Sequence, residues 1–458
     1  MPQGKQVATA RANKPHRDHR ANRLPGFYGM LQLSVRDLKG LRESAGCRAC
    51  RATVNAALLV RAALIVASAV LFISAFSAAF GPQSSIPAVA VFVFILCVRF
   101  VGFNYAPRQN LLALLVVFAV LTAVPLLGQG AGPLARLALN IAGLAVVMVV
   151  GVDDPRMGNG GTYGFGYALL VGASYDAPLS AGQVPARLAT MAAGFALCAA
   201  VYWRCRNRTA EAQAAAAARE RGEMHPYRTI VQALDEASLQ NPKTRYHTRA
   251  ALGISLAFFA GDVLGVERLM WMGLVGSSLL TPYATAVRDR IWWRVGFSAV
   301  GVALFCLVYP AAPPLVQAVF GMVVGMCCGL SGKYHWTQAF NTMGAMLLAQ
   351  TMFGMGGAAF WRIADSLIAA AVVAAFSVAF NRRIGLFRGA GRPRPPDTRV
   401  PGGRGRQMRG RTDAMTCGRA ACSRANRCGG AAHQPAYRAR AWSPNRSGRE
   451  PWGVRRAR

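Results

Sequence analysis

The sequence predicts an all-α polytopic membrane protein with about twelve transmembrane helices, arranged as two six-helix halves with disordered basic termini. Composition is the first reason, because hydrophobic residues make up 53% of the 458 residues and charged residues only 15%. Soluble domains carry about 25% charged residues. The second reason is that the apolar residues fall in runs of about 18 to 20, the length that a helix needs to cross the hydrocarbon core of a bilayer.

A polar segment divides the chain. Residues 204–248 are charged, and we interpret them as a cytosolic linker between a first transmembrane half, 52–203, and a second, 249–383. A basic N-terminal arm, 1–51, and an Arg/Gly/Pro-rich tail, 384–458, flank the two halves. The arm carries a net charge of +8 and the tail +15, of +34 in total, and both are predicted to be cytosolic and mostly disordered. The sequence leaves open whether the tail is functional or an out-of-frame extension.

Short breaks of Gly, Pro and Asn separate the apolar runs, and each run is predicted to be one span. The spans expected in the first half are 54–80, 86–101, 111–127, 134–150, 163–174 and 185–202. Those expected in the second half are 250–266, 269–287, 291–308, 315–330, 336–353 and 361–380. Arg187–Thr190 (RLAT) and Arg362–Asp365 (RIAD) open the last span of each half, a faint repeat that favours two parallel halves.

The distribution of Arg and Lys predicts the orientation. If both termini are cytosolic, the loops on that side hold most of the basic residues between the spans, whereas the outer ends hold Arg136, Arg187, Arg268 and Arg362. Cytosolic loops of membrane proteins carry this excess of basic residues. We therefore expect a multi-pass protein of the bacterial inner membrane with both termini in the cytoplasm.

Charged residues within the spans are candidates for function, because an ion at the centre of a bilayer costs at least ~2.5–3.5 kcal/mol on insertion scales. Arg61 lies in the first span without an acidic neighbour in sequence, and could bind a substrate carboxylate or a buried partner on another helix. Asp365 follows Arg362 by one helical turn, so an i,i+3 pair can form. A buried pair makes Asp365 a candidate proton carrier with Arg362 as its counter-charge; the alternative is a purely structural pair.

Uncharged side chains complete the candidate site. Gln338 and Asn341 lie one turn apart beside Trp336, which suits contact with a planar polar substrate, although interhelical hydrogen bonds would use the same residues. Trp271 opens another span and is a further candidate. Gly321, Gly325 and Gly329 form a stripe of small residues that permits close packing of two helices.

Neither a metal site nor a cofactor site is predicted. Cys47 and Cys50 form a C-x-x-C pair in the arm, but they lack the second pair or the His that a zinc site needs. The same part of the arm, residues 36–50, includes a candidate amphipathic helix at the membrane surface. Nucleotide-binding loops and paired catalytic carboxylates are not evident, so we do not expect an enzyme.

The start of the second half carries a set of motif residues that resembles the fusaric acid resistance protein and aromatic acid exporter family. That family shows an Arg before an Ala/Leu-rich span, a Trp-led span that ends near a Pro, an Arg-rich loop and the pattern Arg-x-x-Gly-Thr-x-x-Gly. The residues at these places are Arg249, Trp271, Pro282, Arg288, Arg290, Arg294, Ser298 and Gly301. Phe297 replaces the first Gly and Ser298 the Thr. Arg362–Ser366 also looks like the family's Arg-x-x-Asp-Thr, and Arg61 with the three residues after it like the first-half counterpart of Arg249.

This resemblance, which covers roughly residues 55–380, implies two six-span halves and proton-driven export of aromatic carboxylates, often with a periplasmic adaptor protein as partner. We therefore expect an exporter of small aromatic or organic carboxylic acids. Its expected partners are the organic anion and membrane lipid, a homo-oligomer is left open, and no specific nucleic acid is expected. The alternative is a non-transporting membrane scaffold or envelope-integrity protein whose basic tails recruit anionic lipid.

Overall fold

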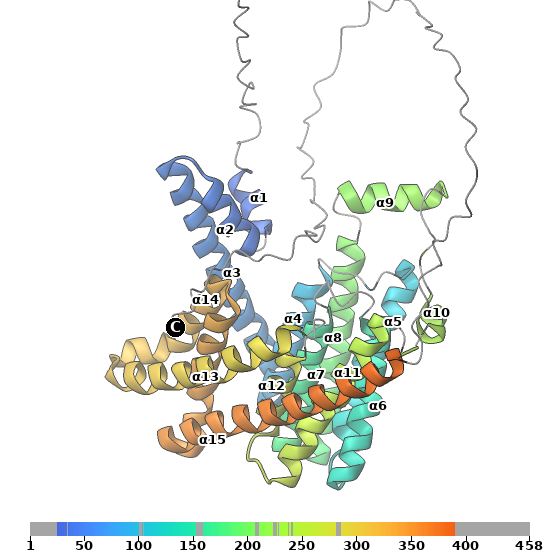
Figure 1. The fold of residues 1–458 in the computed structure, drawn as a ribbon. Coiled ribbons are helices and arrows are strands. Elements are labelled where there is room, and N and C mark those ends of the chain that lie inside the picture. The colour runs from blue at the N-terminus through green and yellow to red at the C-terminus, as the bar shows by residue number, and fades with distance from the viewer. Residues whose placement is uncertain are drawn as a thin grey trace, which may run out of the picture. The chain divides into compact units, whose positions relative to one another are not determined.

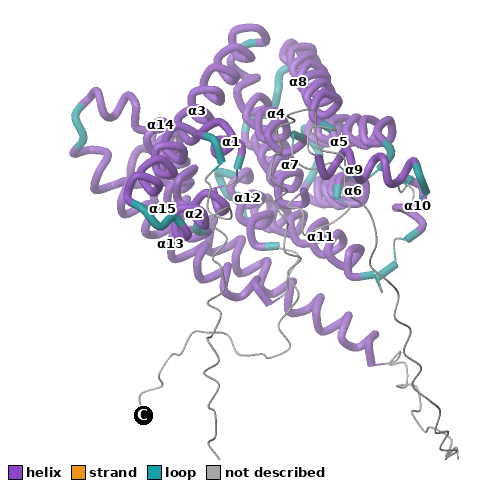
Figure 2. Tube along the Cα trace, turned by 90° about the horizontal axis from the view of Figure 1, so that it is seen from above, coloured by secondary structure: helices purple, strands orange, loops and turns teal. Residues whose placement is uncertain are grey.

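The computed structural model describes residues 25–33, 35–99, 103, 105–152, 159–206, 210–222, 227, 229–236, 238–239, 241–280 and 285–389. The regular elements in these ranges are helices (Figures 1 and 2). Most of the predicted C-terminal tail, the first 24 residues of the arm and the motif residue Pro282 lie outside the described residues.

Seven helices in the described ranges are long and apolar enough to cross a membrane. They are Arg48–Phe80, Pro107–Leu127, Pro133–Gly151, Ala181–Cys205, Asp289–Ala311, Pro314–Ser331 and Tyr334–Arg383. Two shorter apolar helices span Pro82–Val98 and Leu269–Leu279. The chain is therefore a multi-pass helical membrane protein, and the exact number of crossings stays a prediction.

Each predicted span overlaps a helix of the structure (Figure 1). The helices of the first half are α3 (Arg48–Phe80), α4 (Ser85–Val98), α5 (Pro107–Leu127), α6 (Pro133–Gly151), α7 (Asn159–Asp176) and α8 (Val184–Cys205). Those of the second half are α11 (Pro242–Val263), α12 (Leu269–Leu279), α13 (Thr285–Ala311), α14 (Pro314–Ser331) and α15 (Tyr334–Gly389). α15 takes up the last two predicted spans, which are divided by a non-helical residue, Gly354, with φ 67° and ψ 174°.

Proline and glycine explain many of the helix boundaries. α5, α6 and α14 each begin with a proline, whose missing N–H costs nothing at the first position of a helix. α3 and α14 are followed by Gly81 (φ 93°) and Gly332 (φ 60°), conformations that glycine adopts without steric cost. These signals are local, which is why the sequence predicts the helices well.

The N-terminal arm requires a correction. It was predicted to be mostly disordered, but α1 (Phe27–Gln32) and α2 (Val35–Ser44) fold against the first part of α3, which begins within the arm (Figure 1). Met30 and Leu38 are buried there in a small cluster with Val54, Ala57 and Leu58. α2 overlaps the amphipathic helix expected within residues 36–50. Because most of the arm is basic, its overall composition does not reveal the few apolar residues that pack against α3.

The linker also contains helices, α9 (Ala210–Glu220) and α10 (Ile230–Asp235). The backbone N–H of Ile230 donates to Gln109 Oε1 at 3.2 Å, and Ala233 is buried, so that α10 packs on the first half. α11 then begins at Pro242, earlier than the second half was predicted to start.

The two halves contact each other through several helix pairs. α11 packs on α6, and α3 packs on α14. The predicted glycine stripe lies at the second of these contacts, because a Cβ atom at Gly329 would lie 3.7 Å from Ala62 Cβ and one at Gly325 would lie 3.5 Å from Val66 Cγ2. The first helix of each half thus packs on the fourth helix of the other half.

The contact between α7 and α12 fixes one wall of the candidate site. A Cβ atom at Gly172 would lie 2.3 Å from Met270 Cα, so the two helix backbones approach as closely as glycine allows. Asp176, at the end of α7, accepts hydrogen bonds from the backbone N–H groups of Leu269 (2.6 Å) and Met270 (3.3 Å). A carboxylate in this place satisfies N–H groups that have no partner within their own helix.

Replacing Gly172 with Ala should destabilise the protein. The added methyl group meets the backbone of α12, which cannot move as a side chain can, and overpacking of this kind costs about 1–3 kcal/mol or more. Gly161→Ala, on the same helix with no atom within 4 Å of the new Cβ, is the matched control. Thermal unfolding of the purified proteins in detergent should give a melting temperature several degrees lower for Gly172→Ala alone. Equal melting temperatures would contradict the packing described for α7 and α12.

Candidate functional site

A cavity of about 950 Å³ lies among helices of both halves. Most of its wall comes from α12 and α15, with smaller contributions from α4, α7, α13 and the start of α11. The part of the wall that α7 and α12 supply is held by the close contact at Gly172. The cavity therefore depends on packing between segments that are far apart in the sequence.

One face of the first part of α15, before Gly354, lines the cavity. The lining residues on this face recur every three or four positions: Tyr334, Gln338, Asn341, Ala345, Leu348 and Met352. This spacing places them on a single side of the helix. From Tyr334 to Met352 the helix rises roughly 27 Å at about 1.5 Å per residue, which is close to the ~30 Å thickness of the hydrocarbon core.

The charged residues in the described part of the wall are all basic. Four of the lining residues are arginines, namely Arg268, Arg290, Arg294 and Arg362, and none is acidic. Arg294 is 4% exposed and Arg362 is 3% exposed. Among the described residues, Nε of Arg294 and both Nε and Nη1 of Arg362 find no hydrogen-bond acceptor. Since buried cations are normally paired, this arrangement favours an anion as ligand.

Aromatic rings accompany two of the arginines. The guanidinium carbon of Arg362 lies 4.8 Å from the centre of the Trp271 ring, and that of Arg290 lies 4.8 Å from the Tyr334 ring. The Oε1 atom of Gln338 is buried and accepts no hydrogen bond. A planar ligand with an acidic group could therefore contact an indole face, a guanidinium group and an amide.

The two ends of the cavity are built differently. At the Tyr334 end, Arg290 Nη1 donates to the Ser278 carbonyl at 3.4 Å, near the C-terminus of α12. At the other end, Arg268 contacts the sulfur of Met352 and lies 5.4 Å from the centre of the Phe353 ring. Gly354, where α15 changes direction, follows immediately. Cations are thus present at both ends.

The structure brings together most of the residues proposed for substrate binding. Trp271, Gln338 and Asn341 line the cavity, together with Arg362 from the proposed proton-coupling pair and Arg294 from the family motif. Arg61 does not line the cavity, because it lies on α3 and its side chain is partly exposed on that helix. Its position within a span did not reveal which way its side chain faces.

Asp365 lies outside the cavity wall and is fully buried. Neither of its carboxylate oxygens accepts a hydrogen bond, and no salt bridge joins it to Arg362 although the two residues are one turn apart. Among the described residues, a salt bridge of 3.0 Å joins Arg136 on α6 to Asp262 on α11, neither of which lines the cavity. Asp365 is therefore placed to interact with Arg362 through space.

The remaining motif residues have structural surroundings. Ser298 is buried and accepts a hydrogen bond from Thr342 at 3.4 Å, and a Cβ atom at Gly301 would lie 2.5 Å from the Ala339 carbonyl oxygen. Both residues thus support the contact between α13 and α15. Arg249 is buried on α11 and does not line the cavity. The side chain of Arg288 lies outside the described residues, as Pro282 does.

The sequence pattern did not place Arg268 or Arg290 among the candidate substrate-binding residues. Each stands near the end of a predicted span, where an arginine commonly reaches the lipid headgroups. One signal was available for Arg290, because it precedes Arg294 by four residues and therefore shares its helix face. Arg268 could not be assigned, since its place in the cavity depends on the position of α12.

Membrane-length helices around a basic cavity define the class, a multi-pass helical membrane protein with a candidate anion site. Within it, residues 256–376 match the family model described as fusaric acid resistance protein-like, and the family predicted from the sequence is confirmed for this segment. The segment includes all four arginines named above. No curated protein and no solved structure matches the chain.

Proposed function

We propose that this protein is a secondary transporter of the bacterial inner membrane that exports small aromatic or organic carboxylic acids, with protons as the driving ion. The observation that carries the proposal is the pair of buried arginines in the cavity wall beside Trp271: Nε of Arg294, and Nε and Nη1 of Arg362, have no hydrogen-bond partner among the described residues. The match to a family described as fusaric acid resistance protein-like supports an organic acid as the cargo.

Binding would follow from the chemistry of the wall. Guanidinium groups bind carboxylates through two parallel hydrogen bonds, and the attraction is stronger where helices exclude water. The Trp271 ring offers a face for an aromatic group of the same ligand, and Gln338 offers an acceptor for a hydroxyl or acid proton. An uncharged aromatic molecule would leave the arginines unpaired, so acids would be preferred.

The shape of the cavity supports a transport path over a closed binding pocket. Its α15 face extends over most of the thickness of a bilayer, with arginines near each end. Several sites of moderate affinity along a path let an ion enter and leave, whereas one site of very high affinity would retain it. We therefore place Arg290 and Arg294 nearer the cytosolic entrance and Arg268 nearer the exit, as the predicted orientation requires.

Two parallel six-span halves remain part of the proposal. The reciprocal packing of α3 on α14 and of α11 on α6 supports this arrangement, because each contact joins the first helix of one half to the fourth of the other. A periplasmic adaptor protein that receives the acid, and assembly of several copies, are further parts of the proposal that rest on the family resemblance.

Asp365 is the proposed proton carrier. Adding a proton to its carboxyl group changes the charge one helical turn from Arg362 by one unit, so proton binding and acid binding would be thermodynamically linked. The lack of hydrogen-bond partners for the Asp365 carboxylate supports this role, since structural carboxylates in membranes are normally paired.

Arg294→Gln and Arg362→Gln should each weaken binding of benzoate by roughly 10- to 100-fold, because a hydrogen bond to a charged group contributes about 1.5–3 kcal/mol. Titration calorimetry on the purified full chain measures this change. Arg187→Gln is the matched control: Arg187 is also buried, donates to Ser174 at 3.0 Å and does not line the cavity.

Arg61→Gln distinguishes binding of the acid by Arg294 and Arg362 in the cavity from binding by Arg61, the candidate that the sequence suggested. Benzoate affinity should be unchanged, because Arg61 does not line the cavity. A loss of affinity in Arg61→Gln, with normal affinity in the Arg294 and Arg362 variants, would overturn the assignment of the cavity as the binding site.

Asp365→Asn should retain benzoate binding but lose the response of transport to a proton gradient. The amide keeps the size of the side chain but cannot exchange a proton. Uptake of labelled benzoate into inverted vesicles, with and without an imposed gradient, measures the response. Asp262→Asn, which removes the salt bridge to Arg136 outside the cavity, should still respond. Gradient-driven uptake in Asp365→Asn at the wild-type rate would refute the role of Asp365 as proton carrier.

The scaffold alternative gives the opposite pattern. A non-transporting protein would show no benzoate flux in vesicles, and cellular phenotypes would depend on the basic termini and not on Arg294 or Arg362.

A further inference from the structure

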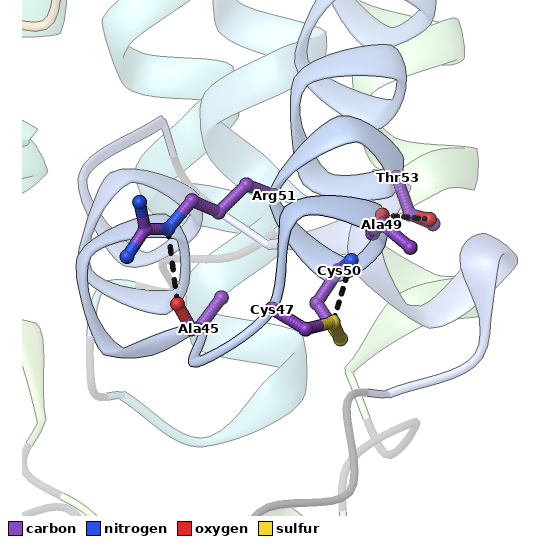
Figure 3. Close-up of a disulfide and its surroundings, with 6 residues drawn as sticks. All are labelled: Ala45, Cys47, Ala49, Cys50, Arg51 and Thr53. Carbon is purple, nitrogen blue, oxygen red and sulfur yellow. Dashed lines mark hydrogen bonds between the residues drawn. A yellow bond between two sulfur atoms is a disulfide. The ribbon is translucent and has the colours of Figure 1, made fainter.

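A disulfide bond between Cys47 and Cys50 lies at the elbow between α2 and α3 (Figure 3). The two residues are three positions apart, and their Cα atoms are separated by 5.3 Å. The other cysteines of the described ranges, Cys97, Cys198, Cys205, Cys306, Cys327 and Cys328, are free thiols. The elbow is thus the place in the described structure where two sulfur atoms are bonded.

Local hydrogen bonds position this pair. Cys47 is the N-cap residue of α3, and its sulfur accepts a hydrogen bond from the backbone N–H of Cys50 at 3.0 Å (Figure 3). Arg51 Nε donates to the Ala45 carbonyl at 3.0 Å and closes the turn from the other side. The disulfide therefore joins the N-cap of α3 to its first turn, next to the short connection between α2 and α3.

Cys47 is exposed, so a reductant in solution can reach its sulfur. Arg48 and Arg51 are exposed in the first turn of α3, and the sulfur lies at the positive end of the helix dipole. Such surroundings stabilise a thiolate, the form that forms and breaks disulfides. The orientation predicted from the positive charge puts this elbow on the cytosolic side, where permanent disulfides are rare and reversible ones serve redox sensing.

The elbow holds the arm against the second half of the protein. Lys39 on α2 donates from Nζ to the Ser331 carbonyl at the end of α14 at 2.6 Å. Burial, and the nearby charges of Lys333 and Arg42, lower the pKa of Lys39. A Cβ atom at Gly332 would lie 2.9 Å from Lys39 Nζ.

We propose that Cys47 and Cys50 form a reversible thiol–disulfide site, exchanged by a dithiol reductant, whose oxidised form locks α1 and α2 against α3 and α14. A thiolate of the reductant attacks the exposed Cys47 sulfur, the S–S bond breaks, and Cys50 leaves as a thiolate that takes up a proton. The second thiol of the reductant then attacks the mixed disulfide and releases Cys47, which is also protonated. The reductant ends as a disulfide, and the two electrons it gives up reduce the protein.

Reduction removes the covalent link across the first turn of α3 but leaves its hydrogen bonds in place. The turn can then open, and the arm can leave α14 for part of the time. This consequence does not depend on transport, so the proposal stands or fails separately from the proposed function.

Hydrogen exchange of the full chain in lipid nanodiscs, with and without dithiothreitol, tests the proposal. Backbone amides of residues 27–44 should exchange roughly tenfold faster after reduction, the effect expected when a short disulfide loop is opened. Peptides around Cys198 in α8, a buried free thiol, serve as the internal control and should not change. Alkylation and mass analysis should find Cys47 and Cys50 modified only after reduction.

A double variant, Cys47→Ser with Cys50→Ser, should exchange at the rate of the reduced protein whether or not the reductant is present. The proposal is wrong if both cysteines are alkylated before reduction, or if residues 27–44 exchange at the same rate in the oxidised and reduced wild-type protein. Because the second comparison uses the wild-type chain, it holds even if the double variant does not fold.

Discussion

Arg294 and Arg362 are cations held within a wall of apolar helices, and the rest of the second half is arranged around them. Each would be costly to bury without a partner, because the free energy of a charge rises steeply when water is replaced by hydrocarbon or protein. The structure reduces this cost by placing both beside a cavity and by setting Arg362 against the Trp271 ring. An acidic ligand would reduce this cost further, so the stability of the wall would depend on the charge of the bound ligand.

The packing of α7 and α12 explains how this part of the cavity wall is held in place. Gly172 lets the backbones approach, and the Asp176 carboxylate holds the first turn of α12, so Trp271 stands on a helix anchored to the other half. α13 and α15 are held together in turn at Gly301 and Ser298. The family motif in α13 therefore maintains the wall, whereas Arg294, at its start, also faces the cavity. A helix interior that contains several glycines would be weak in water, but close packing of glycine faces is common in membranes.

Much of the helical content could be predicted from sequence, because membrane-length apolar runs and the prolines and glycines at their ends are local signals. The rest depends on tertiary contacts. Spacing alone placed Gln338 and Asn341 on one face, and the structure puts both in the cavity, but hydropathy does not reveal the rotation of a helix about its axis. For that reason the sequence could not show that Arg61 lies outside the wall of this cavity or that Arg268 is part of it. The arm was predicted to be disordered because its charge dominates its composition, whereas two buried side chains, Met30 and Leu38, determine its fold.

The central claim is that an acidic molecule binds between Arg294, Arg362 and Trp271. The most direct test is a structure of the full chain soaked with 4-iodobenzoate, in which anomalous scattering locates the iodine atom. We predict a single strong peak inside the cavity, with the carboxylate in contact with Arg294 or Arg362 and the ring near Trp271. An iodine peak confined to the lipid-facing surface or to the vicinity of Arg61, with the cavity empty at saturating ligand, would contradict it.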